Sequence, residues 1–250
     1  MPREKLRHQV REVAARVVLL ANRPGKLSYD QFRYGPLGTY ISWSRRITTW
    51  THGAEAVALA KASQSLPEDA VIVEIGSFLG ASAVLLAGAR KLAGSGRVHC
   101  VDPFDASGDA FSIPVYRRIS DLLGVPLRQC FDDNIHHAGL SDWIDVHQGD
   151  AVTVAAAWQG SIDMLFLDGD QSYPGARAAY EAWSPFLRIG GIIAVHNSRT
   201  GVTHHESHDG HMRVVIENIH PPFYDGVRCV GTTTFARKII DVKVPAMETR

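Results

Sequence analysis

Short apolar runs alternate along the chain with segments whose apolar residues recur every three or four positions. Residues 71–75 form a β-branched apolar run, which is typical of a strand buried on both faces of a parallel sheet. The aliphatic segment 81–93 predicts a helix that ends at the glycines of 94–96. A glycine-containing turn, 76–80, joins the two. This order of strand, glycine turn and helix predicts the first half of a nucleotide-binding α/β unit.

The same alternation continues along most of the chain. Further strands are predicted at 97–102, 143–150, 162–168 and 188–195, followed by an antiparallel pair at 224–230 and 232–238. Helices are predicted at 53–65, 127–138, 151–158, 174–187 and 212–219. Strands that alternate with helices form a mostly parallel sheet with right-handed crossovers. We therefore expect an α/β fold whose ligands bind beyond the carboxyl ends of the strands.

Other segments suggest additions to this core. Residues 4–22 predict an amphipathic helix with a basic face, which would be solvated or contact another subunit or an acidic substrate. Residues 24–48 are rich in glycine, proline, serine and aromatic residues, and predict an ordered loop at a cofactor or substrate pocket. The long connection 103–126 predicts a substrate loop. We divide the chain into an N-terminal extension over 1–50, an α/β domain over 51–240 and a flexible tail over 241–250.

Composition narrows the class of protein. The chain has 26 Lys plus Arg and 26 Asp plus Glu, so it lacks the basic field of a general nucleic-acid binder. No apolar run reaches membrane-spanning length. The three cysteines, Cys100, Cys130 and Cys229, are too few and too scattered for a disulfide framework, and fit a reducing cytosol. We expect a cytoplasmic protein that binds neither nucleic acid nor membranes.

Polar residues or glycines end five successive strands. Asp102 ends the second strand, where a carboxylate can accept both hydroxyl protons of a ribose, or can cap a turn. Asp150 ends the third, where it could bind an adenine amino group, cap the next helix, or do both. The others are Gly76-Ser77, Asp168-Gly169-Asp170 and His196-Asn197. Because parallel strands end at the same edge of a sheet, these residues are expected to share one crevice.

Several of these motifs together resemble a known family. Residues 74–80, 101–102, 149–150, 166–173 and 187–191 resemble the ordered motifs of class I S-adenosylmethionine-dependent methyltransferases. The DGD-x-SY element and the His196-Asn197 pair are similar to bacterial small-molecule O-methyltransferases that methylate sugar hydroxyls of antibiotics and related glycosides. The resemblance covers residues 50–240. It implies a Rossmann-like sheet of seven strands, mostly parallel with the last antiparallel, helices on both faces, and a cofactor-binding catalytic domain.

The resemblance also implies the residues that hold S-adenosylmethionine (SAM). The glycine turn and its neighbours would hold the methionine part, through Gly76, Ser77 and Gly80, with Glu74 and Ser82 nearby. Asp102 would bind the ribose, and Asp150 with Ala151 the adenine. A saccharide or other small hydroxylated molecule would be the acceptor.

Metal-dependent relatives imply a second set of residues. A divalent ion, Mg²⁺ or Mn²⁺, would bind Asp168, His196 and Asn197 and lower the pKa of the acceptor hydroxyl. Asp170 stands where such enzymes carry a candidate general base. Two departures weaken this assignment: Gln171 replaces a histidine, and Asn197 replaces an acid. Without a metal, His196 becomes the better base, since its unperturbed pKa lies near neutrality.

Three further questions stay open at this level. A dehydrogenase that uses NAD is a competing interpretation, although 76–78 lacks the middle glycine that admits a pyrophosphate. A cofactor-binding regulator without activity is a third, motivated by Gln171. The histidine-rich loop 204–211 could chelate zinc, but a polar lid over the acceptor is the preferred interpretation. A homodimer through the N-terminal helices is expected.

Overall fold

The computed structural model describes residues 24–240, and within them seven strands form one sheet. The strands are β1 (Val71–Ile75), β2 (Arg97–Asp102), β3 (Ile144–Gln148), β4 (Ile162–Leu167), β5 (Leu187–Val195), β6 (Tyr224–Val230) and β7 (Thr233–Lys238). Their order is β3-β2-β1-β4-β5-β7-β6. Strands β1 to β5 are parallel to one another, and β7 is antiparallel to both β5 and β6. This confirms the predicted sheet.

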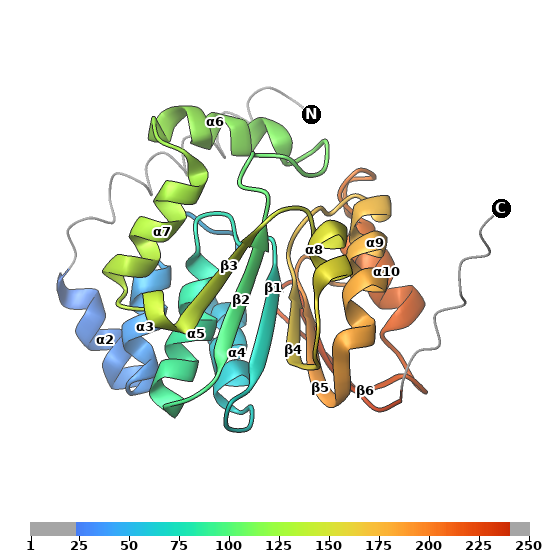
Figure 1. Ribbon diagram of the computed structural model, residues 1–250, viewed down its shortest axis with the longest axis horizontal. Coiled ribbons are helices and arrows are strands. Elements are labelled where there is room, and N and C mark those ends of the chain that lie inside the picture. Colours follow the sequence, from blue (N-terminus) through green and yellow to red (C-terminus); the bar gives the residue numbers. More distant parts are fainter. Residues whose placement is uncertain (1–23, 241–250) are drawn as a thin grey trace.

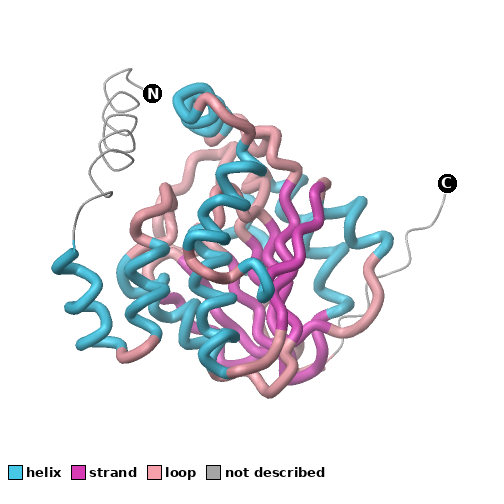
Figure 2. The backbone as a smooth tube through the Cα atoms, turned by 60° about the vertical axis from the view of Figure 1, so that its left-hand side comes forward, coloured by secondary structure: helices cyan, strands magenta, loops and turns pink. Residues whose placement is uncertain are grey.

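Helices cover both faces of the sheet (Figures 1 and 2). They are α2 (Pro24–Tyr34), α3 (Leu37–Ser44), α4 (Gly53–Gln64), α5 (Ala81–Ala93), α6 (Ile113–Leu123), α7 (Leu127–His137), α8 (Ala151–Ala157), α9 (Tyr173–Trp183) and α10 (Gly210–Asn218). Side chains of β1 alternate between the two faces, since Ile72 packs with α3, α4, α5 and α7, and Val73 and Ile75 pack with α8, α9 and α10. This two-sided burial explains why β1 is apolar at every position except Glu74.

The prediction of a loop over 24–48 is wrong, because this segment contains α2 and α3. Its prolines mark helix starts: Pro24 is the first residue of α2, and Pro36 directly precedes α3. Proline is well suited to these positions because its fixed φ is helical and its missing N–H would have no partner there. Tyr40 and Ile41 of α3 are buried in the same core as α5. The boundary proposed at residue 50 stays a prediction.

Two predicted segments lie outside the described residues. They are the helix over 4–22, on which the homodimer prediction depends, and the tail over 241–250. The long connection 103–126 is described, and it contains α6, which the sequence had not indicated. Within residues 24–240, none of the helices has the length and apolar character needed to cross a membrane.

Candidate functional site

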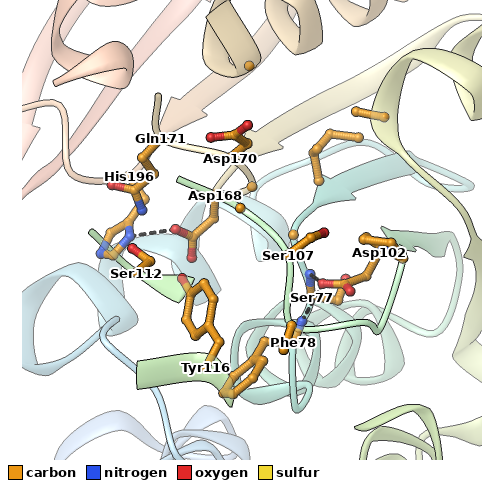
Figure 3. A pocket seen from close by; sticks show the side chains of 18 of the residues that line it. Ser77, Phe78, Asp102, Ser107, Ser112, Tyr116, Asp168, Asp170, Gln171 and His196 are labelled. Carbon is orange, nitrogen blue, oxygen red and sulfur yellow. Dashed lines mark hydrogen bonds and ion pairs between the residues drawn. The ribbon is translucent and has the colours of Figure 1, made fainter. Parts of the chain in front are cut away.

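A pocket of about 450 Å³ lies at the carboxyl ends of β1 to β5 (Figure 3). Its wall contains most of the site residues predicted from the sequence: Gly76, Ser77, Ser82, Asp102, Asp150, Ala151, Asp168, Asp170, His196 and Asn197. Parallel strands bring these residues together because each connection leaves the sheet at the same edge. Glu74 and Gly80 are the two predicted residues that do not line the pocket.

Asp102 fixes the shape of the glycine turn that follows β1. One carboxylate oxygen accepts hydrogen bonds from the backbone N–H groups of Ser77 and Phe78, at 2.9 and 2.8 Å. The other accepts the N–H of Phe104 at 2.6 Å. Burial raises the pKa of Asp102, and these three bonds oppose that rise. A carboxylate can accept about four hydrogen bonds, so some capacity is left for a ligand hydroxyl. The predicted ribose contact stays a prediction.

Glu74 lies behind the turn and away from the pocket. It is fully buried and accepts hydrogen bonds from the Ser77 hydroxyl at 2.6 Å and the Cys100 thiol at 3.3 Å. Its other oxygen, Oε1, has no partner among the described residues. Burial raises the pKa of Glu74 to about 7. Glu74 therefore supports Ser77 from the side away from the pocket. Gly80, in a left-handed conformation, directly precedes the first residue of α5.

Replacing Glu74 by glutamine should change how stability depends on pH. Because the pKa of Glu74 is higher in the folded state, its contribution to folding is greatest below about pH 4.5 and declines as the pH rises toward 7. Glu74→Gln removes this decline, so the variant should gain about 2 to 3 kcal/mol relative to wild type between about pH 5 and pH 8. Urea unfolding at both pH values measures this difference. The exposed Glu68 is the control, since Glu68→Gln should follow wild type at both. An unchanged pH dependence in Glu74→Gln would contradict the assignment.

Asp150 caps the helix that follows β3. Its carboxylate accepts the N–H groups of Val152 and Thr153 at 3.1 and 2.9 Å. The Thr153 side chain, together with these N–H groups, lowers the pKa of Asp150. The capping interpretation is therefore confirmed. Asp150 also lines the pocket together with Ala151. The contact of both residues with adenine stays a prediction.

Asp168 and His196 form a buried pair that is extended by Glu55. The Nδ1 atom of His196 lies 2.6 Å from Oδ1 of Asp168, and its Nε2 lies 4.0 Å from Oε1 of Glu55. His196 is only 1 % exposed, whereas Asp168 is 18 % exposed and borders the pocket. Burial raises the pKa of Asp168, partly offset by His196. Burial lowers the pKa of His196, but the two carboxylates more than compensate and raise it. A ligand in the pocket can thus contact the Asp168 carboxylate, whereas the His196 ring is almost fully buried.

The predicted metal set of Asp168, His196 and Asn197 stays a prediction. A metal needs free lone pairs. Nδ1 of His196 is bound to Asp168, whereas its Nε2 lies 4.0 Å from Oε1 of Glu55 and has no hydrogen-bond partner among the described residues. The Nδ2 atom of Asn197 donates to Gln171 at 3.1 Å, and this bond does not use the lone pairs of Oδ1, the atom through which an asparagine binds a metal. Residues 24–240 contain no group of three or more His, Cys, Asp or Glu placed to hold a metal. This also applies to the histidines of 204–211. We therefore derive no step through a metal.

Asp170 also borders the pocket, but one of its oxygens has a structural partner. Its Oδ1 accepts the N–H of Ser172 at 2.8 Å, at the start of α9. The Asp170 side chain is exposed, unlike that of the neighbouring Gln171. Figure 3 shows the carboxylates of Asp168 and Asp170 apart from one another, with only Asp168 bonded to His196. The two acids therefore have different surroundings and separable roles.

Sequence reasoning missed the contacts that close the pocket over these acids. The buried Asp109 accepts the N–H groups of Phe111 and Ser112, and lies 3.2 Å from Nδ1 of His208. The Phe111 ring contacts His208, with centroids 4.9 Å apart. These contacts join the connection after β2 to the histidine-rich loop after β5. Residues 109 and 208 carry no sequence signal for this pairing. Mobility of the loop stays a prediction.

Three aromatic rings from distant segments form another part of the wall. Trp50, Phe78 and Tyr116 are in mutual contact, with centroids 5.2 to 5.7 Å apart. All three line the pocket. The Tyr116 hydroxyl points toward Asp168 in Figure 3. Only the turn residue Phe78 belongs to a motif that the sequence singled out as a cofactor site.

Solved structures share this fold at low sequence identity. TomG from Streptomyces achromogenes, an O-methyltransferase of tomaymycin synthesis in complex with SAM, has a TM-score of 0.55 and 16 % identity, over 85 % of this chain and 96 % of that one. CalS11, a TDP-rhamnose 3'-O-methyltransferase of calicheamicin biosynthesis, has a TM-score of 0.52 and 17 % identity, over 95 % of each chain. The cofactor-bound Rv0187 from MTB has a TM-score of 0.57 and 18 % identity, over 87 % and 99 %.

A family model described as a methyltransferase domain matches residues 73–198, which is half of the chain. The match begins within β1 and ends just after His196-Asn197, so it spans the five strand ends that form the pocket. The resemblance found in the sequence motifs is therefore confirmed, and the chain belongs to this family of methyltransferase domains.

Proposed function

We propose that this enzyme transfers a methyl group from SAM to a hydroxyl of a small molecule, with a sugar or glycoside as the expected acceptor. The observation that carries the proposal is the convergence of the glycine turn, Asp102 and the Asp168–His196 pair on one pocket. Neighbours named as O-methyltransferases, one of them acting on TDP-rhamnose, support the choice of a hydroxyl acceptor.

The pocket residues fit SAM in the arrangement expected from the sequence. Gly76 and Ser77 would border its methionine part, with Gly80 and Ser82 at the adjoining start of α5. Asp102 would accept a ribose hydroxyl proton with its remaining capacity, and Asp150 with Ala151 would border the adenine. Glu74 is assigned to support of Ser77 instead of direct contact. When bound, SAM supplies a methyl group on a positively charged sulfur.

We assign Asp168 as the general base that takes the proton of the acceptor hydroxyl. As the hydroxyl oxygen gains the methyl group, its proton passes to the Asp168 carboxylate, whose raised pKa favours acceptance. His196 orients this carboxylate through their 2.6 Å hydrogen bond. His196 is less suitable as the base itself, because its ring is only 1 % exposed. Asp170 stays the second candidate for the base.

Calorimetry with the full-length protein tests the cofactor assignment. We expect SAM to bind and NAD not to, because Ser77 and Phe78 stand where a pyrophosphate would need a bare backbone. Mass spectrometry with a panel of hydroxylated acceptors then measures methyl transfer. Binding of NAD alone would replace the proposal with an oxidoreductase, and SAM binding without transfer to any acceptor would indicate a regulator.

A further inference from the structure

The pocket is strongly biased toward negative charge. Five aspartates line it, and no lysine or arginine of residues 24–240 does. The aspartates are Asp102, Asp105, Asp150, Asp168 and Asp170. The other titratable side chains of the wall are Tyr116 and the two histidines, His196 and His208. A wall of this kind attracts cations and repels anions, and its concave shape strengthens the field.

These carboxylates are held by hydrogen bonds and a histidine instead of by lysine or arginine. Asp102 and Asp150 accept backbone N–H groups, as described above. Asp105 does the same with the N–H of Ser107, at 2.9 Å, and Asp170 with that of Ser172. Backbone donors stabilise a carboxylate without cancelling its charge. Even if Asp168 and His196 are counted as a neutral pair, the carboxylates of Asp105 and Asp170 leave the wall of the pocket negative.

Two helix N-termini at the pocket are already occupied, whereas that of α5, where the methionine part of SAM is expected, has no side-chain cap. The N-terminus of α8 is capped by Asp150, and that of α9 by Ser172, with Asp170 directly beside it. A phosphate or carboxylate usually binds such helix N-termini or the side chains of arginine and lysine. The capped N-termini of α8 and α9 therefore offer no free anion site, and no lysine or arginine of residues 24–240 lines the pocket.

The aromatic wall adds a feature that suits a cation. Trp50, Phe78 and Tyr116 border the same cavity as the aspartates. The face of an aromatic ring attracts an ammonium group and also packs against the apolar face of a sugar ring. Ser107 and Ser112 provide hydroxyl groups in the same wall. Together these residues fit a hydroxylated ring that carries an amine.

We propose that the acceptor is a hydroxyl compound bearing a protonated amine, such as an amino sugar, and that the pocket rejects phosphorylated or carboxylated acceptors. This inference rests on the proposed methyl transfer in the same pocket. It separates this chain from its neighbour CalS11, whose named substrate is a TDP-sugar and therefore carries phosphates.

Three matched acceptors test the inference: methyl 6-amino-6-deoxyglucoside, methyl glucoside and methyl glucuronide, which carry an amine, a hydroxyl and a carboxylate at the same C6 position. Calorimetry on the full-length protein loaded with S-adenosylhomocysteine gives their affinities without requiring turnover. We expect the amine to bind at least about tenfold more tightly than the carboxylate, as opposite charges near a partly exposed wall imply. Equal affinities, tighter binding of the carboxylate, or binding of none at millimolar concentration overturns the inference.

A pair of variants tests whether the pocket charge is the cause. Asp105→Asn keeps the hydrogen bond to Ser107 but removes a charge from the wall, so the amine-to-carboxylate ratio of affinities should fall by about threefold or more. Asp121→Asn removes the same charge from the exposed part of α6, which does not line the pocket, and should leave the ratio unchanged. An equal change in both variants would indicate general charge and overturn the inference.

The same measurements distinguish the inference from the proposed function. Failure of the protein to bind SAM or S-adenosylhomocysteine counts against the proposed function. Methyl transfer that is fastest to the glucuronide, measured by mass spectrometry, leaves the proposed function in place and overturns the charge preference alone.

Discussion

Asp168→Asn should reduce the rate of methyl transfer about a thousandfold, because an amide of the same shape cannot accept the acceptor's proton. Asparagine still reaches His196, so the fold and the binding of SAM should change little. The variant is compared with wild type by the rate of S-adenosylhomocysteine formation at saturating acceptor, and by calorimetry with SAM. A large loss of rate with near-normal SAM affinity assigns Asp168 to the chemical step.

Asp170→Asn is the matched control for this prediction. It removes the same charge two residues away, but the asparagine can still accept the N–H of Ser172. We expect a loss of about tenfold or less, since Asp170 lacks the histidine partner that orients Asp168. If Asp170→Asn is the inactive variant and Asp168→Asn keeps most of its rate, the base is Asp170 and the assignment must be exchanged.

Gly76→Ala should destabilise the fold by about 3 kcal/mol and abolish SAM binding, through left-handed strain and overpacking. The φ of Gly76 is +87°. An added Cβ would lie 2.5 Å from the backbone oxygen of Asp168 and 2.6 Å from Cα of Gly169. Because both are backbone atoms, the start of the turn after β4 would have to move, which would displace Asp168. Urea unfolding and calorimetry with SAM measure the two effects.

Gly94 offers a control with the same backbone conformation in open space. Its φ is +82°, and an added Cβ would meet no atom within 4 Å. Gly94→Ala should therefore lower the free energy of unfolding only by the left-handed strain, about 1 to 2 kcal/mol, and should bind SAM normally. Equal losses in the two variants would show that backbone conformation, and not the contact with Asp168, determines the importance of Gly76.

The strands and most helices could be predicted because their periodicity is a direct result of burial. Strand β1 is apolar at every position except Glu74, because both of its faces are covered. The error over 24–48 arose because glycine and proline usually interrupt helices, whereas here the prolines begin them. Helix α6 was missed because Gly108 and Pro114 are typical of a loop, whereas Pro114 lies in the first turn of the helix, a position that proline favours.

The site could be predicted only as far as topology determines it. Parallel strands bring their carboxyl ends together, so Asp102, Asp150 and Asp168 were expected in one crevice. Side-chain direction and pairing between distant segments have no such rule. Glu74 is one residue before the end of its strand, and its side chain turns into the core. The pairing of Asp109 with His208 joins two loops whose lengths and compositions do not indicate each other.

The contacts of Glu55 link the Asp168–His196 pair to the hairpin formed by β6 and β7. Glu55 accepts the N–H and hydroxyl of Thr232, which lies 177 residues later, and it faces His196. During synthesis on the ribosome, Glu55 emerges long before Thr232 does. A carboxylate without partners stays in water, since burying it alone is costly. A nascent chain that has not yet reached residue 232 therefore cannot complete the support of His196.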